Sequence, residues 1–223
     1  MFTEVETSAR MNEAYKKYRA AKKSSLNTAA FSGFLNIPIQ QVSEKVGNLA
    51  CRSGCSHCCY LRVSAYSFEI VSIYFYLVTR LDKDALAAFK ERLQEKAISV
   101  SSMSVDEHYI TNVQCPMLED NKCIVYPVRP MACAGYHSLS EPTCRDSYEH
   151  PEIVGDDGDG IPMALDVKEM QSFQSGIAEA VLNEENDDTG RYELISALYQ
   201  IFEKPTLLQL WRNGRKMFSN LPD

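Results

Sequence analysis

The sequence predicts a mainly α-helical single domain, residues 1–223, arranged around a small irregular cysteine-rich core with room for one short β-hairpin. Apolar residues recur at helical spacing in the first and last parts of the chain. This periodicity is lost over residues 113–144, where prolines and cysteines gather. Hydrophobic residues make up 45% of the chain, so a core can be built without disulfides.

Two helices are expected before the cysteines, within residues 1–48. Residues 7–24 are dominated by Ala, Glu, Lys and Arg, and Thr7 or Ser8 suits the N-cap of a helix. Residues 28–47 carry apolar side chains at helical spacing. An internal proline would kink or split this second helix, and the glycine at its last position suits its end.

Two further helices are expected after the first cysteines. A short extended piece near Val63 leads to Ser67, which suits the N-cap of a helix over residues 68–80. Asp82 then begins a helix that continues through Met103, with apolar residues on one face.

The irregular region contains the expected hairpin. The stretch "CPMLEDNKCIVY", residues 115–126, predicts two short strands around an "EDNK" turn. Polar residues 150–162, "HPEIVGDDGDGIP", predict a loop.

Three helices are expected to close the chain within residues 163–220. The first begins near Asp166, with Glu169 three residues later as a capping-box partner. The second covers residues 189–204. The third follows Pro205 and carries the apolar residues Leu207, Leu210, Trp211 and Phe218.

The cysteines dominate the chemistry of the chain. Residues 51–59 read "CRSGCSHCC", and the eight cysteines all lie within residues 51–144. No secretory signal precedes them, and the longest apolar run, residues 70–78, is too short for a membrane span. We therefore expect a cytoplasmic protein without membrane association, where clustered thiols more often hold a metal than form disulfides. Zn²⁺ and iron–sulfur clusters each typically take four such donors.

Two separated motifs resemble the CxxCxxCC family of zinc- or iron-chelating proteins, also called YkgJ-type cysteine-cluster proteins. The matching stretches are "CRSGCSHCC", "FEIVSIYFYL" and "CPMLEDNKCIVYPVRPMAC", which together cover about residues 51–137. The chain departs from the family pattern with three residues between Cys51 and Cys55, and with Ala134 after Cys133. The resemblance implies a metal held by the cysteines.

Carried over by position, the resemblance implies these metal ligands: Cys51, Cys55, Cys58, Cys59, Cys115, Cys123 and Cys133. Cys144 lies outside the matching text and is an eighth candidate, a ligand or a bystander. Arg129 is a candidate for offsetting the negative charge of several thiolates. Tyr126 is a candidate for donating to a ligand or for packing. Adjacent cysteines 58 and 59 point in different directions if the backbone is extended, so they would serve two metals or only one would bind.

The four histidines are weaker candidates. His57 lies inside the first cysteine loop and His137 follows Cys133 by four residues, and both are interpreted as spacers because eight thiols are available. His108 and His150 lack supporting context. No catalytic residue is assigned, because no arrangement of nucleophile and base can be identified from the sequence, and enzyme activity is left open.

The sequence allows three functions. The first is a metal-binding protein, with zinc, in a structural or metal-handling role. The second is an iron or [4Fe–4S] protein, with methyl transfer or radical S-adenosylmethionine-like chemistry. The third is a protein-interaction module with a metal scaffold, in which basic residues of the N-terminal helix contact a protein partner. The net charge of −7 disfavours nucleic-acid binding.

Overall fold

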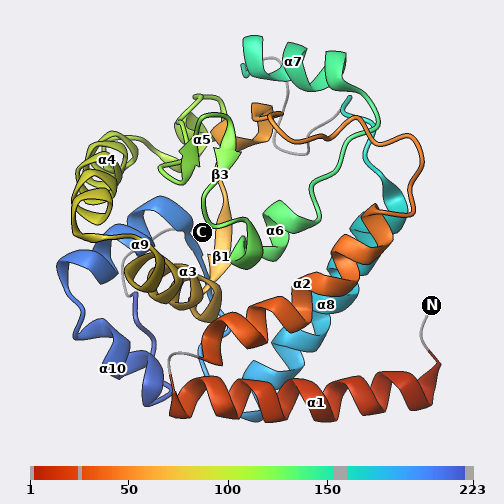
Figure 1. The fold of residues 1–223 in the computed structure, drawn as a ribbon, viewed down its shortest axis with the longest axis vertical. Helices are drawn as coiled ribbons and strands as arrows, with labels where there is room; N and C mark the ends of the chain where they lie inside the picture. Colours follow the sequence, from red (N-terminus) through yellow and green to blue (C-terminus); the bar gives the residue numbers. More distant parts are fainter. Residues whose placement is uncertain (1–2, 25–26, 153–159, 219–223) are drawn as a thin grey trace.

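The computed structural model describes residues 3–24, 27–152 and 160–218. The fold is mainly α-helical, as predicted, and its long helices α1, α2 and α8 pack side by side (Figure 1). The α-helices are α1 (Glu4–Lys23), α2 (Thr28–Ser43), α3 (Ser67–Arg80), α4 (Lys83–Ser101), α5 (Val105–Tyr109), α6 (Met131–Ala134), α7 (Glu141–Glu149), α8 (Leu165–Glu184), α9 (Leu194–Glu203) and α10 (Leu207–Arg212). The described residues also form the 3₁₀ helices η2 (His57–Tyr60) and η3 (Tyr126–Val128) and the strands β1 (Ser64–Tyr66), β2 (Leu118–Glu119), β3 (Lys122–Cys123) and β4 (Arg191–Glu193).

Helix α1 begins one turn earlier than the sequence predicted. Thr3, rather than Thr7 or Ser8, is its N-cap, because the Thr3 hydroxyl accepts a hydrogen bond from the Glu6 amide at 3.3 Å. The Glu6 carboxylate in turn accepts from the Thr3 amide at 2.8 Å, which completes a capping box. Of the other predicted starts, Asp82 does cap α4, accepting from the amides of the second and third helical residues.

Several predicted boundaries at the helix ends are wrong. Helix α2 continues through Pro38 and ends at Ser43, before the predicted end at Gly47. Helix α3 includes Ser67, and its N-cap is Tyr66. Helix α4 ends at Ser101, and the short helices α5, α6 and α7 were not predicted.

The expected C-terminal helices form: α8 starts at Leu165, close to the predicted Asp166, and α10 follows Pro205 as predicted, whereas the start of α9 differs. Helix α8 follows Ala164 without a side-chain cap, so Glu169 makes no capping box. Residues Arg191–Glu193 are a strand, because they pair with β1, and α9 starts only at Leu194. Helix α10 ends before Phe218, which is nevertheless buried. Part of the predicted polar loop, residues 153–159, lies outside the described residues.

Two small antiparallel sheets join distant and local segments. Strands β1 and β4 pair with Ala65 opposite Tyr192. Strands β2 and β3 form the predicted hairpin, whose turn residues Asp120 and Asn121 have φ values of 47° and 57°. Positive φ at both positions is typical of a type I′ turn, which Asn and Asp tolerate. Within the described ranges, no helix has the length and apolar character to cross a membrane.

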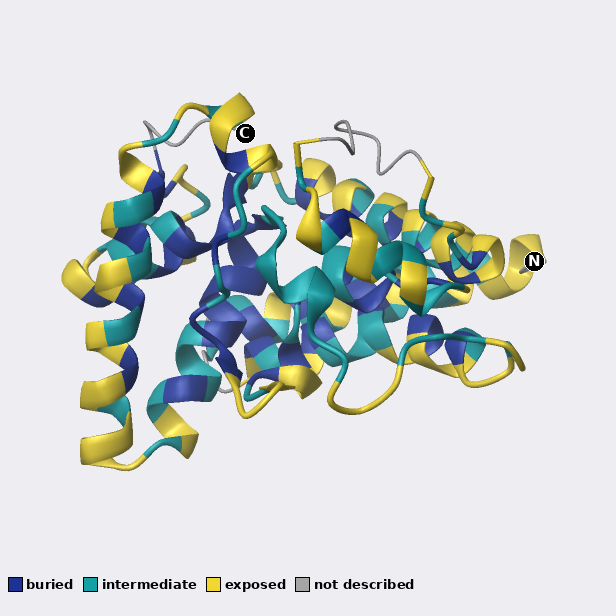
Figure 2. Ribbon diagram, turned by 90° about the horizontal axis from the view of Figure 1, so that it is seen from above, coloured by how far each residue is buried: buried dark blue, intermediate teal, exposed yellow. Residues whose placement is uncertain are grey.

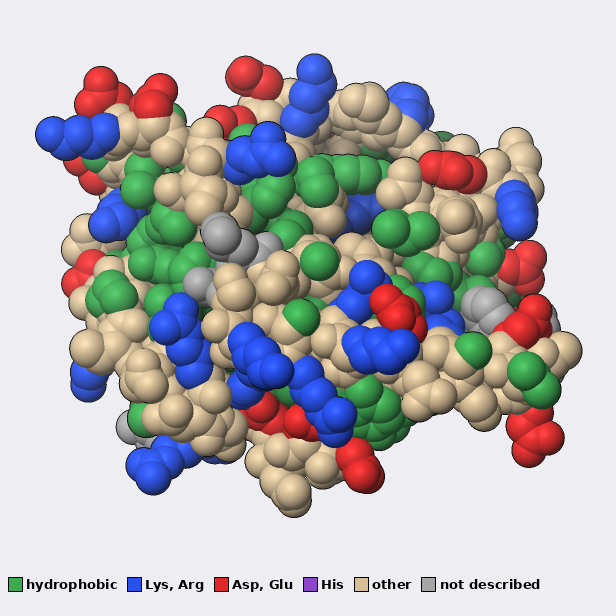
Figure 3. Space-filling view, turned by 60° about the horizontal axis from the view of Figure 1, so that its bottom comes forward, with side chains coloured by type: hydrophobic (Ala, Val, Ile, Leu, Met, Phe, Trp, Pro, Cys, Tyr) green, Lys and Arg blue, Asp and Glu red, His purple; other side chains and the backbone are tan. Residues whose placement is uncertain are grey.

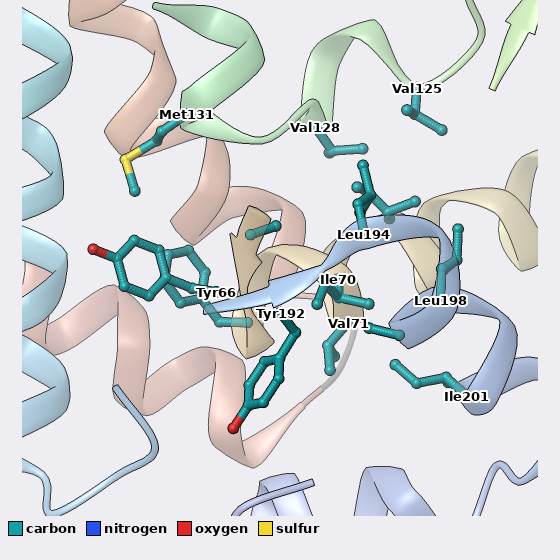
Figure 4. Close-up of a cluster of buried hydrophobic side chains, with 14 of the residues drawn as sticks. Tyr66, Ile70, Val71, Val125, Val128, Met131, Tyr192, Leu194, Leu198 and Ile201 are labelled. Atoms are coloured by element: carbon teal, nitrogen blue, oxygen red, sulfur yellow. The ribbon is translucent and has the colours of Figure 1, made fainter. Parts of the chain in front are cut away.

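The second cysteine-rich block, residues 115–133, is attached to the helical core by apolar residues. Val125, Val128 and Met131 are buried in the same cluster as residues of α3, β4 and α9 (Figure 4). The helices turn their buried positions inward and their exposed positions outward (Figure 2). Cys123 and Cys133 therefore lie on a segment whose backbone is held by core packing.

A buried carboxylate makes a second attachment. Glu69, in the first turn of α3, is buried and accepts hydrogen bonds from the Tyr66 amide at 2.9 Å and the Met131 amide at 2.7 Å. Met131 is the first residue of α6, so one carboxylate caps the start of two helices. Burial raises the pKa of Glu69 to about 7, although the two amides act in the opposite direction.

A buried ion pair attaches α1 to the C-terminal half. Lys22 contacts the carboxylate of Asp187 and the carbonyl of Trp211. The Asp187 side chain is only 2% exposed and also accepts from the Tyr18 hydroxyl at 2.7 Å. Removing one partner of such a pair leaves an uncompensated buried charge.

Other basic residues of α1 also have intramolecular partners. Lys17 pairs with Glu13 at 3.4 Å, and Arg19 pairs with Glu185 at 2.7 Å. The face that carries α1 shows Lys and Arg side chains interspersed with Asp and Glu (Figure 3). Some of the basic residues of α1 that were expected to contact a protein partner therefore form ion pairs within the chain.

We expect Glu69→Gln to reduce the pH dependence of stability. The pKa of Glu69 is raised from 4.5 to about 7 in the fold, so its contribution is fully present below pH 4.5 and is lost as the pH rises through about 7. This shift corresponds to about 3 kcal/mol. Urea unfolding of metal-loaded protein at pH 5 to 8 should show wild type losing about 2–3 kcal/mol more than the variant.

The matched control is Glu91→Gln, because Glu91 is an exposed carboxylate on α4. It should keep the pH dependence of the wild type. Parallel curves for wild type and Glu69→Gln would contradict the account of Glu69.

We expect Lys22→Ala to lower the free energy of unfolding by about 3 kcal/mol, because Asp187 is left buried without its cation. Lys23→Ala, which truncates the exposed neighbour, should change it by less than about 0.5 kcal/mol. Urea unfolding measures both, and equal effects would show that the Lys22–Asp187 pair does not stabilise the fold.

Candidate metal centre

Four segments of the chain bring the cysteines together. The loop of residues 51–55 and η2 carry the first four cysteines, the hairpin carries Cys115 and Cys123, α6 carries Cys133, and α7 carries Cys144. In Figure 1, η2 and α7 lie near one another at one end of the molecule, with the hairpin between them and α6. The Tyr60 and Tyr148 rings, 4.8 Å apart, hold η2 against α7.

Backbone hydrogen bonds fix the relative positions of these segments. The Cys115 amide donates to the Cys59 carbonyl at 2.8 Å, which joins η2 to the hairpin. The Ala50 amide donates to the Ser138 carbonyl at 2.9 Å, which joins the first loop to the segment after α6. The cysteines thus meet through pairing between residues that are 56 or more positions apart in the chain, counting 59 to 115.

The wide spacing between the first two cysteines is absorbed by a turn. The Cys55 amide donates to the Arg52 carbonyl at 3.0 Å, and Gly54, the third residue of this turn, has a φ of +90°. A positive φ at this position is typical of a type II turn and favours glycine. The three-residue spacing therefore forms a tight turn that returns Cys55 toward Cys51.

One sulfur atom accepts a hydrogen bond from a backbone amide, and the pKa values of two other thiols are lowered by a nearby amide. The Ser138 amide donates to Cys51 Sγ at 3.4 Å. The Met117 amide interacts with Cys115 and the Val125 amide with Cys123, and each lowers the pKa of its thiol against the larger effect of burial. Amide donors aimed at sulfur stabilise the thiolate form, which is the form that binds metals.

Without a metal, the buried thiols favour their protonated form. Burial raises the pKa of Cys115 to about 12 and that of Cys133 well above its ordinary range. The pKa of Cys58 is raised well above 9 by a hydrogen bond with Cys59 and by burial. Such thiols need a cation to become thiolates, and a bound metal ion supplies one.

Arg129 is a nearby cation of this region. Its guanidinium acts to lower the pKa of Cys58, Cys123 and Cys133, although burial has a larger effect on each. The same guanidinium lies 3.9 Å from the centre of the Tyr126 ring. Tyr126 is 48% exposed, so its visible role is to hold Arg129 by a cation–π contact.

The eight cysteine thiols suit a thiophilic metal, although their sulfur atoms do not stand at the positions of a complete coordination shell. All eight cysteines are half-buried free thiols, and none forms a disulfide. Among the described residues, no three Cys, His, Asp or Glu side chains already stand at the mutual distances of a metal site. The fold gathers cysteine thiols in one region, with backbone amides near some of them. Zn²⁺ and iron–sulfur centres bind to such soft sulfur donors.

The histidines have separate environments. His57 Nε2 lies 3.4 Å from a Glu141 carboxylate oxygen, so its ring faces α7. His137 is buried, with 8% exposed, and burial lowers its pKa. His108 is buried beside Glu193, and His150 Nδ1 lies 3.8 Å from Glu152.

Sequence reasoning missed Ser138 and Glu69 as residues that shape this region. Ser138 contacts Cys51 through its amide and Cys144 through its side chain, and Glu69 holds the start of α6. Ser138 carries no sequence signal, because its role depends on tertiary pairing. From the sequence, Glu69 could be placed in the first turn of the helix over residues 68–80. That position predicts only a favourable interaction of its charge with the helix dipole.

The comparisons with known proteins identify the cysteine region. Residues 50–152 match the model of the CxxCxxCC family, described as a "putative zinc- or iron-chelating domain". No curated protein and no solved structure matches the chain. The matched segment extends past the resemblance over residues 51–137 and contains all eight cysteines, including Cys144. Residues 50–152, a little under half of the chain, are therefore similar to the zinc- or iron-chelating domain of the CxxCxxCC family.

Proposed function

We propose that this protein binds zinc through the thiolates of its cysteine cluster, and that the metal has a structural or metal-handling role in the cytoplasm. The observation that carries the proposal is the gathering of eight free thiols from four segments, with backbone amides near Cys51, Cys115 and Cys123. Zinc is favoured because it binds thiolates tightly and because four protein ligands complete its coordination without a substrate or a redox partner.

The structural role follows from where the cysteines lie. The first loop and η2 contain little regular structure, and the second block contains a hairpin of two residues per strand. Few main-chain hydrogen bonds hold such segments, so metal–sulfur bonds would supply much of their rigidity. Because the site does not exist in the unfolded chain, the binding energy of the metal would become folding energy.

Each residue group has a stated role in the proposal. The cysteines provide sulfur donors, and the amides of Met117, Val125 and Ser138 stabilise their negative charge. Arg129 offsets part of the excess charge of the thiolates, and Tyr126 positions the guanidinium. Glu69 holds α6, and therefore Cys133, against the helical core.

Iron is the second candidate metal, in a mononuclear site or a [4Fe–4S] cluster. It is supported by the Cys51-x₃-Cys55-x₂-Cys58 spacing, which suits an iron–sulfur cluster, and by the zinc- or iron-chelating description of the family. Methyl transfer or radical chemistry would require iron, rather than zinc, at these cysteines.

We expect Cys123→Ser and Cys55→Ser each to lower metal content and stability together. A serine hydroxyl is a harder and weaker donor than a thiolate, so each variant should lose at least about half of its bound metal. The melting temperature should fall by about 5 °C or more, because each kcal/mol is worth about 2–4 °C for a chain of this size. Elemental analysis and thermal unfolding of protein purified without oxygen measure the two effects.

Ser53→Ala is the control, because Ser53 is an exposed residue of the same loop. It should keep both metal content and melting temperature. If both cysteine variants retained full metal content, the proposed function would be wrong.

A further inference from the structure

A cavity of about 400 Å³ lies between helices α4, α5 and α9. Helices α4 and α9 pack against each other, and α5 follows α4 in the chain (Figure 1). Small-molecule sites commonly have volumes of about 300–1,000 Å³, so the cavity is large enough for a small organic ligand. None of the described residues that line it is a cysteine, so the cavity is separate from the candidate metal ligands.

Two side chains of opposite charge line the cavity, and strand pairing places them near each other. Ser64 of β1 lies directly opposite Glu193 of β4. Opposite residues of an antiparallel pair carry their side chains on the same face, with Cβ atoms about 4.5–5.5 Å apart. Arg62 Nη1 donates to the Ser64 hydroxyl at 3.0 Å, which brings the guanidinium close to the Glu193 side chain. A cation and an anion therefore lie on one wall of the cavity.

Other contacts hold both charges in position. The Arg62 guanidinium also donates to the Tyr109 hydroxyl at 3.3 Å and lies 5.1 Å from the centre of the Tyr109 ring. Glu193 is buried, and its carboxylate accepts from the amides of Ile195 at 2.9 Å and Ser196 at 2.7 Å. A carboxylate has about four acceptor positions, so the two amides leave room for a further donor. Charged groups fixed in this way need little further ordering when a ligand binds.

The rest of the described lining carries no charge near neutral pH. His108 is buried, and burial lowers the pKa of its imidazole, although Glu193 acts in the opposite direction. The last turns of α4 supply the apolar side chains of Ile98 and Val100, and Met103 follows them. The cavity therefore combines one positive charge, one negative charge and an apolar wall.

We propose that this cavity binds a free α-amino acid with an apolar side chain. The carboxylate of the ligand pairs with Arg62, its ammonium group pairs with Glu193, and its side chain packs against the apolar residues of α4. A zwitterion matches both charges of the wall, whereas an organic acid, an amine or one end of a peptide chain matches only one. The charge left unmatched would then be covered by an apolar molecule, which is unfavourable.

Isothermal titration calorimetry of the full-length protein with L-leucine tests the proposal. Two probes keep the branched aliphatic part of leucine: 4-methylpentanoate lacks the ammonium group, and 3-methylbutylamine lacks the carboxylate. We expect about one L-leucine to bind per chain, and each probe to bind at least about tenfold more weakly, because one charge of the cavity is left without its partner.

Variants assign the binding to this cavity. Arg62→Gln and Glu193→Gln should each weaken the binding of L-leucine at least about tenfold, and Arg62→Gln should not weaken the binding of 3-methylbutylamine, which has no carboxylate. The matched control is Arg80→Gln, because Arg80 is an exposed residue of α3 outside the cavity lining, and it should bind L-leucine as the wild type does.

A third variant keeps the test independent of the two charges, because Glu193 also caps α9. Ser196→Phe places a large side chain in the cavity from a half-buried position of its wall and should abolish the binding of L-leucine. Circular dichroism checks that each variant keeps its helical signal.

The contradicting outcomes do not bear on the metal. If L-leucine, L-methionine and L-phenylalanine all failed to bind to the wild-type protein at millimolar concentration, the proposal would be wrong. Equal affinities for L-leucine and for either probe would overturn the recognition of a zwitterion. Unchanged binding of L-leucine in both Arg62→Gln and Ser196→Phe would show that the ligand binds elsewhere. Each of these results leaves the metal content, measured by elemental analysis of the same samples, as the separate test of the proposed function.

Discussion

The crowding of thiols within a partly buried region is the constraint on which the rest of the structure depends. Burial is the main cause that raises the pKa of Cys115 to about 12, so the thiol of Cys115 is neutral when no metal is bound. Several thiolates at such short range would repel one another strongly unless cations separated them. The fold supplies one such cation, Arg129, together with backbone amides near three of the sulfurs. The proposed metal supplies the larger part of the compensating charge.

The helices provide a frame that positions the cysteine segments, because residues of both belong to one buried core. Val125, Val128 and Met131 belong to the buried core, and Glu69 connects α3 to α6 through one carboxylate. The second block is therefore held on the core side even where its regular structure is short. The first loop is held differently, by pairing with the hairpin and with the segment after α6. Metal binding would connect the firmly held block to the less firmly held loop.

Local signals in the sequence predicted the elements whose cause is local. Asp82 caps its helix as expected, and "EDNK" forms the hairpin because Asp120 and Asn121 tolerate positive φ. Elements with tertiary causes were missed. Residues Arg191–Glu193 have helical neighbours but form a strand, because β1 lies alongside them. The N-cap Thr3 is an exception, because its signal is local: Thr3 and Glu6 form the Thr-x-x-Glu pattern of a capping box, and Thr7 was chosen instead.

The candidate metal site also has features that the sequence could predict and features that depend on the tertiary structure. Cysteine spacing predicts which residues would supply donors, because clustered soft ligands are typical of metal sites, and this ligand set stays a prediction. It could not predict how they are grouped, because the grouping depends on Ser138, on the Gly54 turn and on the contact between η2 and the hairpin. Each of these joins residues whose relation is set by the fold rather than by their separation in the chain.

X-ray absorption at the metal edge of the protein, purified without oxygen and without added metal, tests the central claim most directly. The edge identifies the element, and the fine structure reports the atoms bound to it. The account predicts zinc with a first shell of sulfur only, at about 2.3 Å. A first shell of nitrogen and oxygen would contradict it, because the cysteines would then not be the ligands.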